Sequence, residues 1–247
     1  MSGPGHDDQN MPVAPWERAR KRPAAVRVPL TRERIVDAAF VVLDREGFDR
    51  LSMRQVAAEL GVAVSALYAH VESKDELFQH MYARLFDGYE LPDPDPANWQ
   101  EQIKDYARRG RARLLEHRDM ARISMAHVPF TPELLPHVER LMAILRSAGL
   151  PDKVVAAAGD MISTYMDGFA FEESMWEERR RTTQADTWDE MQVTLKEYFD
   201  ALPADRFPNL VELSRMMFHD TNDSRFELGL EIILRGLASY VQPRDPA

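Results

Sequence analysis

The charged side chains most able to bind a partner are concentrated near the N-terminus. Residues 18–34 hold seven Lys and Arg against one Glu, a formal charge of +6, whereas the whole chain of 247 residues carries −10. A basic arm on an acidic body indicates that only this end meets a polyanion. The competing interpretation is a solvated tail. The basic residues are Arg18, Arg20, Lys21, Arg22, Arg27, Arg32 and Arg34.

The residues that catalysis or metal binding would need do not form a recognisable set. The chain has no Cys, which excludes disulfides, Cys-ligated zinc and thiol redox chemistry. It also lacks the P-loop, GxGxxG, HExxH and GxSxG motifs. His117, His127 and His137 fall ten residues apart, but prolines interrupt this segment, so surface or pocket histidines are favoured over metal ligands. We predict no catalytic residue, no cofactor and no metal site.

Proline breaks helix interiors, so its positions outline the elements that carry the side chains. Within the long proline-free runs, apolar residues recur every three or four positions, which is typical of amphipathic helices. We therefore predict an all-α fold. No apolar run is long enough to span a membrane, and a cytoplasmic protein is expected. The proline-free runs are 30–91, 97–128, 137–150, 152–202 and 209–242.

The clearest boundary in the chain is Leu91–Pro96, where prolines alternate with other residues. It separates a small unit over residues 29–91 from a larger helical unit over residues 97–242. The polar, proline-rich and basic residues 1–28 are expected to form a flexible arm. The chain is therefore predicted to consist of an arm, a small domain and a large domain.

The small unit is predicted to contain short helices with defined ends. Apolar spacing predicts a first helix over Arg32–Glu46, with Gly47 as its C-terminal stop. Capping boxes at Ser52–Gln55 and Ser73–Glu76 open two further helices. Between them, Gly61 permits a tight turn before a short helix over Val64–His70. Two short helices joined by such a turn are typical of a helix-turn-helix.

The large unit contains two segments that are predicted to be long helices, Asp152–Arg181 and Ser224–Val241. The second opens with a capping box at Ser224 and Glu227. Its apolar residues lie on more than one face, which indicates a subunit interface as well as a core. One predicted stripe is Phe226, Leu230, Ile233, Leu237 and Tyr240, and the other holds Leu228 and Ile232.

Three stretches of the small unit resemble the DNA-binding domain of the tetracycline-repressor (TetR) family. They are Thr31–Phe48, Leu51–Val62 and Ala66–Leu77, the last with the core Leu-Tyr-x-His-Val-x-x-Lys. More weakly, Arg225–Leu237 resembles the last helix of the tetracycline-repressor-like C-terminal domain. The resemblance implies a three-helix N-terminal DNA-binding domain with a helix-turn-helix, followed by a larger helical domain for ligand binding and dimerisation.

The resemblance also implies roles for individual residues. The first residues of the recognition helix would enter the major groove, and the donors after them would hold phosphates. Arg54 would reach a base edge from the preceding helix, although an ion pair with a nearby carboxylate is the alternative. Together with the arm, the predicted DNA-binding residues are Arg20, Arg22, Ser52, Arg54, Val64, Ser65, Tyr68, His70 and Lys74.

The recognition helix has few side chains that can form hydrogen bonds to bases, because Ala63–His70 holds mostly small and apolar side chains. Ala and Val can contact a thymine methyl group but cannot form bidentate hydrogen bonds. We therefore expect Arg54 and the arm to supply an unusual share of the discrimination. At ~3.3 Å per extended residue, the arm could reach ~30 Å, into an adjacent minor groove.

The predicted function is that of a transcriptional repressor, a homodimer released from a palindromic double-stranded DNA operator by a small-molecule effector. The effector would bind in the large unit, near His127, Met161, Tyr165 and Phe169, although the last three side chains suit a core or a dimer interface at least as well. The alternatives are a DNA-binding dimer without an effector and, far less favoured, an enzyme.

Overall fold

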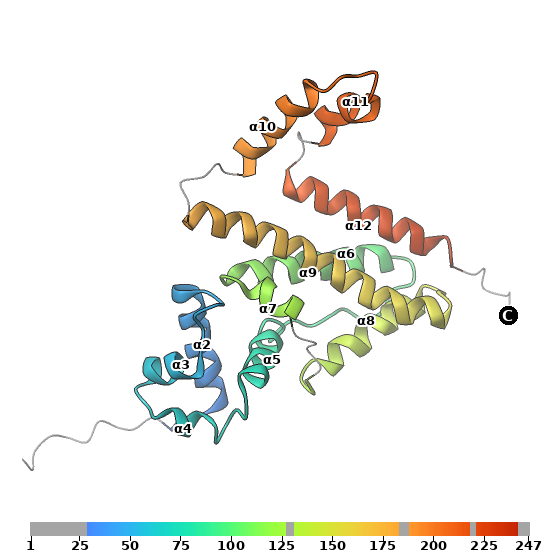
Figure 1. The fold of residues 1–247 in the computed structure, drawn as a ribbon. Coiled ribbons are helices and arrows are strands. Elements are labelled where there is room, and N and C mark those ends of the chain that lie inside the picture. The colour runs from blue at the N-terminus through green and yellow to red at the C-terminus, as the bar shows by residue number, and fades with distance from the viewer. Residues whose placement is uncertain (1–28, 127–130, 183–187, 218–220, 242–247) are drawn as a thin grey trace, which may run out of the picture. The chain divides into compact units, whose positions relative to one another are not determined.

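The computed structural model describes residues 29–126, 131–182, 188–217 and 221–241, and every regular element within these ranges is a helix (Figure 1). The predicted all-α fold is confirmed. None of the described helices combines the length and the apolarity that crossing a lipid bilayer requires. The helices are α2 (Arg32–Glu46), α3 (Met53–Leu60), α4 (Val64–Leu67), α5 (Lys74–Arg84), α6 (Trp99–Glu116), α7 (Met120–Ala126), α8 (Leu135–Ser147), α9 (Asp152–Thr182), α10 (Trp188–Asp200), α11 (Pro208–Met217) and α12 (Asn222–Ala238).

Helix α2 has the predicted bounds and buries the predicted face. Ile35, Ala39 and Leu43 recur every four residues, and none of their surface is exposed. Gly47 then ends the helix with a left-handed φ of 82°, which glycine adopts without steric cost. Because α2 packs on both α3 and α5, the helices of the small unit share one core.

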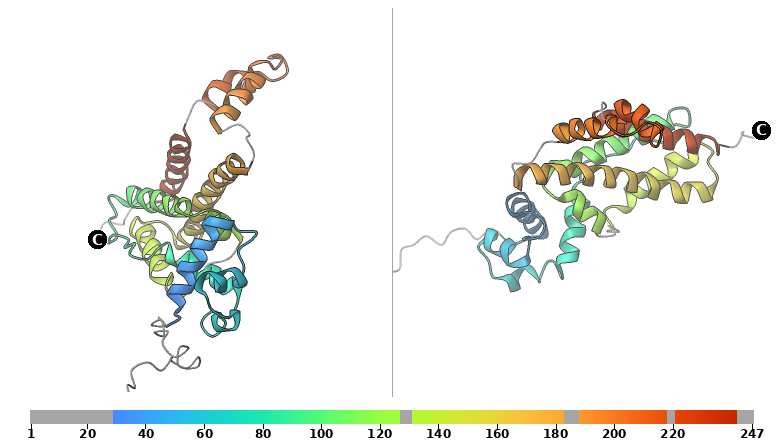
Figure 2. Two further views of the ribbon diagram at one scale, coloured as in Figure 1. Left: turned by 90° about the vertical axis from the view of Figure 1, so that its left-hand side faces the viewer. Right: turned by 45° about the horizontal axis from the view of Figure 1, so that its top comes forward.

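Helix α9 is the element on which the large unit is assembled. Ala158, Ile162, Met166 and Ala170 are spaced by four residues along it, and each is at most 1% exposed. Residues four apart lie on one face of a helix, so these side chains form a continuous buried stripe. Helices α6, α7, α8 and α12 pack against α9, as the views in Figure 2 allow the reader to follow.

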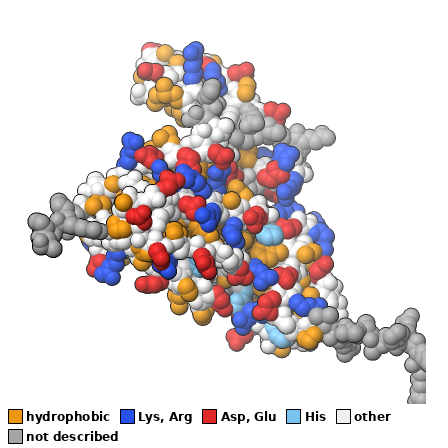
Figure 3. All heavy atoms as spheres, turned by 180° about the vertical axis from the view of Figure 1, so that it is seen from behind, with side chains coloured by type: hydrophobic (Ala, Val, Ile, Leu, Met, Phe, Trp, Pro, Cys, Tyr) orange, Lys and Arg blue, Asp and Glu red, His pale blue; other side chains and the backbone are white. Residues whose placement is uncertain are grey.

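Charged side chains join α6 to α9 and α12. Arg111 binds the Glu173 carboxylate through two nitrogens at 2.8 and 2.6 Å, and both side chains are largely buried. Arg108 binds Glu227 in the same bidentate way, at 2.6 and 2.7 Å. The planar guanidinium matches the two oxygens of a carboxylate, which gives these contacts a defined direction. Figure 3 shows Lys and Arg interleaved with Asp and Glu over one face of the molecule.

Helix α12 begins earlier than the predicted capping box placed it. Thr221 is the N-cap, and its hydroxyl oxygen accepts a hydrogen bond from the Ser224 N–H at 3.2 Å. The prediction that Ser224 caps the helix was therefore wrong. Asn222 and Asp223 instead occupy the first turn, where a negative charge is favourable beside the positive end of the helix dipole. The helix ends at Ala238, before the predicted Val241.

The two predicted stripes of α12 have different environments. Phe226, Leu230 and Leu237 are buried as predicted, and Leu234 joins them. Tyr240 is 57% exposed, so its place in the core stripe was wrong; it lies beyond the end of the helix. The second stripe remains open to solvent in the single chain, with Leu228 58% and Ile232 63% exposed.

Helices α10 and α11 pack against each other. The Ser214 hydroxyl is buried between them and donates to the Asp200 carboxylate at 2.6 Å. Much of the apolar surface of this pair is nevertheless exposed in the single chain. The exposed apolar residues on it are Val193, Tyr198, Leu210, Leu213, Met216 and Met217.

A close approach between α9 and α12 depends on Gly229. A side-chain carbon at this position would collide with the Tyr165 ring and hydroxyl, which is held by a hydrogen bond to the Phe226 carbonyl at 3.0 Å. We therefore expect Gly229→Ala to lower the free energy of unfolding by about 1–3 kcal/mol in urea titrations. Gly168→Ala, on α9, is the control because nothing lies within 4 Å of its added carbon. Equal stability of the two variants would contradict this packing.

Candidate DNA interface and its contact with the large unit

The helix-turn-helix is built from α3, a glycine turn and α4. The Ser52 hydroxyl oxygen accepts from the Gln55 N–H at 3.4 Å, so Ser52 caps α3 as predicted. Gly61 ends α3 in the left-handed conformation, with φ at 66°. Helix α4 is only four residues long and ends at Leu67, so the predicted extension to His70 was wrong; Leu67 is fully buried. Such a short helix is not stable alone, so its packing through Leu67 holds it in place.

The predicted DNA-binding residues of the small unit lie at the N-cap of α3, on α3 and α4, in the turn after α4 and at the start of α5. Arg54, Ser65 and Tyr68 are exposed, and half of the Tyr68 surface faces solvent. Val64 and His70 are partly buried. Within the described part of the chain, Arg54 makes no ion pair, which removes support from the alternative role predicted for it. The exposed donors are therefore available to a partner.

Lys74 has a more constrained position than the sequence indicates. It is the first residue of α5, and its ammonium nitrogen lies 5.5 Å from the centre of the Phe48 ring and 5.0 Å from that of Phe78. A cation over aromatic rings is attracted to their electron-rich faces. Lys74 therefore also belongs to the packing between α5 and the turn after α2.

The turn between α6 and α7 is hydrogen-bonded to the C-terminal end of α2. The Asp44 carboxylate accepts from the His117 ring and from the Arg118 N–H, both at 2.9 Å. In return, the Asp119 carboxylate accepts from the Phe48 N–H at 2.8 Å. We refer to these five residues as the α2 contact. It ties the helix-turn-helix unit to α6 and α7, both of which pack on α9.

Two backbone features show that the α2 contact is closely packed. Asp119 is the one described residue other than glycine with a positive φ, at 56°. A carbon added at Gly47 would lie 2.9 Å from a guanidinium nitrogen of Arg118 and 3.0 Å from the Asp119 carboxylate. Most residues with a side-chain carbon are disfavoured at a positive φ. The backbone at Gly47 and at Asp119 therefore restricts which residues can occupy the two sides of the contact.

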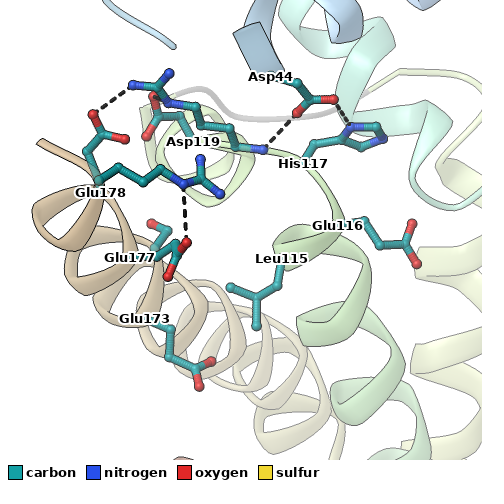
Figure 4. A pocket seen from close by; sticks show the side chains of 11 residues that line it. Asp44, Leu115, Glu116, His117, Asp119, Glu173, Glu177 and Glu178 are labelled. Carbon is teal, nitrogen blue, oxygen red and sulfur yellow. Dashed lines mark hydrogen bonds and ion pairs between the residues drawn. The ribbon is translucent and has the colours of Figure 1, made fainter. Parts of the chain in front are cut away.

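A hollow of about 430 Å³ lies beside the α2 contact (Figure 4). Arg118 reaches across it to the Glu178 carboxylate of α9 at 2.7 Å, and Arg181 binds Glu177 at 3.2 Å. Glu177 and Arg181 are four residues apart on α9, the spacing that places two side chains on one face of a helix. Through Arg118, the α2 contact therefore extends directly to α9.

The carboxyl group of Asp167 is buried deep in the large unit. Asp167 of α9 is only 9% exposed, and its Oδ1 atom has no hydrogen-bond partner among the described residues. Burial raises the pKa of this carboxyl to about 7, despite a hydrogen bond from Ser124 that lowers the pKa. Burial likewise raises the pKa values of the Tyr82 and Tyr106 phenols, and the negative charge of the nearby Asp167 raises them further. This cluster holds an uncompensated carboxyl in the core.

Comparison with known proteins agrees with this architecture. The family model for bacterial regulatory proteins of the tetR family matches residues 35–81, and that for the tetracyclin repressor-like C-terminal domain matches residues 91–241. The chain is 32% identical over 233 residues to the HTH-type transcriptional repressor DrrR1 of Streptomyces coeruleorubidus, a match that covers 93% of this chain and 85% of that protein. The chain belongs to the TetR family. It is therefore a DNA-binding transcriptional regulator.

Solved structures of TetR-family proteins show similar folds. Streptomyces coelicolor ActR, determined in complex with actinorhodin, is 41% identical and has a TM-score of 0.77; the match covers 87% of this chain and all of that chain. BioQ, determined with its double-stranded DNA operator, is 27% identical, with a TM-score of 0.59 and coverage of 85% of this chain and 99% of that chain. Both similarities extend over the small and the large unit.

Of the effector residues predicted for this TetR-family chain, the structure brings two together. Tyr165 and Phe169 lie together, with ring centres 6.0 Å apart, but both pack against Phe226 of α12. Met161 is 42% exposed on α9. His127 falls outside the described residues, as do Arg20 and Arg22 of the arm.

Sequence reasoning missed the residues that connect the two units of this regulator. Asp44, Arg118 and Asp119 are ordinary charged residues in the sequence, and their partners lie about 70 residues away. No local spacing encodes such a pairing. His117 and His137, considered and set aside as metal ligands, instead bind Asp44 and the Tyr89 carbonyl. The only local signal was Gly47, which predicted the end of α2 and nothing more.

The α2 contact predicts unequal effects of two substitutions at the same position. Asp119→Ala removes the acceptor of the Phe48 N–H and places a less tolerant residue at positive φ, so the free energy of unfolding should fall by about 1–3 kcal/mol. Asp119→Asn keeps an acceptor and tolerates this backbone, so its loss should be smaller. Urea unfolding at one protein concentration measures both. Wild-type stability of Asp119→Ala would contradict the contact.

The buried carboxyl predicts a pH dependence of stability. Because the pKa of Asp167 in the folded protein, about 7, exceeds the ordinary aspartate value of 3.8, the unfolded chain loses this proton first as the pH rises. Asp167 should therefore reduce stability progressively from about pH 4 to pH 7, by at most about 4 kcal/mol. Asp167→Asn should gain stability relative to wild type over this window, unlike Asp160→Asn, which changes an exposed carboxyl of the same helix. If the free energies of unfolding of the wild type and Asp167→Asn changed with pH in the same way, the burial of this carboxyl would be contradicted.

Proposed function

We propose that this regulator is a homodimeric repressor that binds a palindromic operator and is released from it by a small-molecule ligand. The observation that carries the proposal is the exposed face of α3 and α4, which holds Arg54, Ser65 and Tyr68 without an intramolecular use for them. The size of α4 suits insertion into the major groove, and hydroxyl and guanidinium donors suit phosphates and base edges.

The second stripe of α12 supports dimerisation. Leu228 and Ile232 lie one helical turn apart and are both more than half exposed, and the added carbon of Gly236, a further turn along, would meet nothing within 4 Å. An apolar stripe beside a glycine allows a second helix to approach closely. A twofold axis along this stripe would use the same surface on both subunits and would carry two recognition helices, as a palindrome requires.

The ligand response rests on the α2 contact and on the relatives. A ligand that shifts α6, α7 or α9 acts on groups that are hydrogen-bonded to the end of α2. Displacement of α2 would alter the spacing of the two recognition helices and so disfavour the DNA-bound conformation. ActR, the relative determined with actinorhodin, shares this arrangement of domains over the matched 87% of the chain.

Selection from random duplex DNA by the full-length protein, at a moderate and stated salt concentration, tests this function. We expect enrichment of a palindrome with half-sites separated by about one helical turn. The same selection with Arg54→Ala should lose preference mainly at one position of each half-site, and operator affinity should fall by about 1–3 kcal/mol. Tyr68→Phe is the matched control because loss of a phosphate contact should weaken all sequences alike.

Two outcomes would contradict the proposal. If the wild-type protein enriched no sequence, the proposal of a specific operator would be wrong. An asymmetric selected site would contradict the dimeric arrangement. If Arg54→Ala retained the wild-type preference at every position, Arg54 would not read a base. The selected operator then also serves as the probe for ligand-dependent release.

A further inference from the structure

One side chain of the large unit binds the turn that follows α2. Arg122 of α7 donates to both carboxylate oxygens of Asp49, through two nitrogens at 3.1 and 2.9 Å. Its guanidinium carbon also lies 4.4 Å from the centre of the neighbouring Phe48 ring. A planar guanidinium can bind a carboxylate and lie against an aromatic ring at the same time. Arg122 therefore holds two consecutive side chains of this turn.

The ring that Arg122 contacts also contacts Lys74. The Lys74 ammonium nitrogen is 5.5 Å from the centre of the Phe48 ring and 5.0 Å from that of Phe78. The two rings are stacked, with their centres 5.5 Å apart and an angle of 24° between them. A lysine side chain is flexible, so an ammonium group without such contacts would occupy many positions. The two rings therefore restrict the ammonium group before DNA binds.

Lys74 is at a position that is electrostatically unfavourable for a cation. It is the first residue of α5, next to the positive end of the helix dipole. Attraction to the faces of the two rings offsets part of this cost. A phosphate bound here would interact favourably with the ammonium group and with the end of the helix. The position of Lys74 therefore suits an anionic partner.

Asp49 is a competitor of DNA for Lys74 within the chain. Its side chain is 77% exposed. The Arg122 guanidinium holds the pKa of this carboxyl below its ordinary value, and the charge of the nearby Lys74 lowers the pKa further. In the described part of the chain, however, Lys74 forms no ion pair, whereas Arg122 occupies both Asp49 oxygens. Without Arg122, the exposed carboxylate would be free to pair with Lys74.

We propose that Arg122 is a positioning residue for operator binding. It keeps the Asp49 carboxylate away from the Lys74 ammonium group, and it holds the Phe48 ring against which that group lies. Lys74 is then ordered and without a carboxylate partner when a DNA phosphate approaches. The inference rests on the proposed function and on the phosphate contact expected of Lys74. It assigns a part in the affinity for DNA to a residue outside the helix-turn-helix.

Operator affinity of the full-length protein tests this inference. Arg122→Gln releases the Asp49 carboxylate and should weaken binding of the selected operator about tenfold, since the effect is repeated in both subunits of the proposed dimer. Adding Asp49→Asn removes the competing charge and should return the affinity to within about threefold of wild type. A merely structural role of the ion pair predicts no such rescue, because the pair is absent from both variants.

A second pair of variants tests whether the effect passes through Lys74. Lys74→Met keeps an unbranched side chain and removes the charge. The slope of log affinity against log salt concentration should become shallower by about two, one for each subunit. In this background, Arg122→Gln should change the affinity by less than about twofold, because no ammonium group remains for Asp49 to bind.

The role of the ring is tested separately. Phe48→Leu keeps an apolar side chain but removes the aromatic face, so it should weaken operator binding about threefold when Lys74 is present. It should have little effect in the Lys74→Met background. Phe48→Tyr retains the ring and should bind the operator as the wild type does.

Arg109→Gln is the matched control for the loss of one positive charge. Arg109 also pairs with an aspartate, Asp105, at 2.6 Å, and its guanidinium carbon lies 5.1 Å from the centre of the Tyr89 ring. Both members of this pair belong to α6. Arg109→Gln should bind the operator within about twofold of wild type. Circular dichroism establishes that each variant is folded.

Four results would overturn the inference. They are equal affinities of Arg122→Gln and Arg109→Gln, a loss that Asp49→Asn does not restore, an equal loss in the Lys74→Met background, and an unchanged salt slope in Lys74→Met. In each case an operator has been selected and is bound, so the proposed function stands. If no operator is selected, the proposed function itself has failed, and the two failures are therefore distinguishable.

Discussion

The arrangement of this regulator depends on a short hydrogen-bonded contact between the end of α2 and the α6–α7 turn. Asp44 accepts from the turn and Asp119 accepts from the Phe48 N–H, so each side supplies an acceptor to the other. The contact is closely packed, because a carbon added at Gly47 would lie 2.9 Å from the Arg118 guanidinium, and Asp119 has a positive φ. Packed interfaces of this kind change between discrete arrangements and do not deform gradually, which is the property that a regulatory connection requires.

The large unit supplies the other half of that connection. Helix α9 contacts α6, α7, α8 and α12, and Arg118 of the turn binds Glu178 on it. Arg118 therefore connects the α2 contact to α9 through an ion pair. The buried Asp167 lies on the same helix, and its uncompensated carboxyl makes the packing around it less stable than an apolar core would be. The proposed function uses both features, because a regulator must be able to leave its DNA-bound conformation.

The fold could be predicted from the sequence wherever the determining signals are local. The period of apolar residues gave α2 and α9, and the capping serines at positions 52 and 73 gave the starts of α3 and α5. The predicted start of α12 was wrong because Thr221 and Ser224 are both suitable N-cap residues, and the sequence alone does not show which of them caps the helix. The hydrogen bond between His137 and the Tyr89 carbonyl could not be predicted, since the two residues are 48 apart in the chain and meet only when α8 packs beside the segment that follows α5. Tyr165 and Phe169 have the helical spacing of either a pocket or a core, and long-range packing against Phe226 places them in the core.

The central claim is that the α2 contact transmits changes between the DNA-binding unit and the large unit. Amide hydrogen exchange with and without the selected operator tests it most directly, because the α6–α7 turn carries none of the predicted DNA-binding residues. The account predicts that operator binding slows exchange in α2 and also in the turn and α7 of the wild type. In Asp119→Ala, the slowing should be confined to the DNA-binding unit. Unchanged exchange in the turn of the operator-bound wild type would contradict the account.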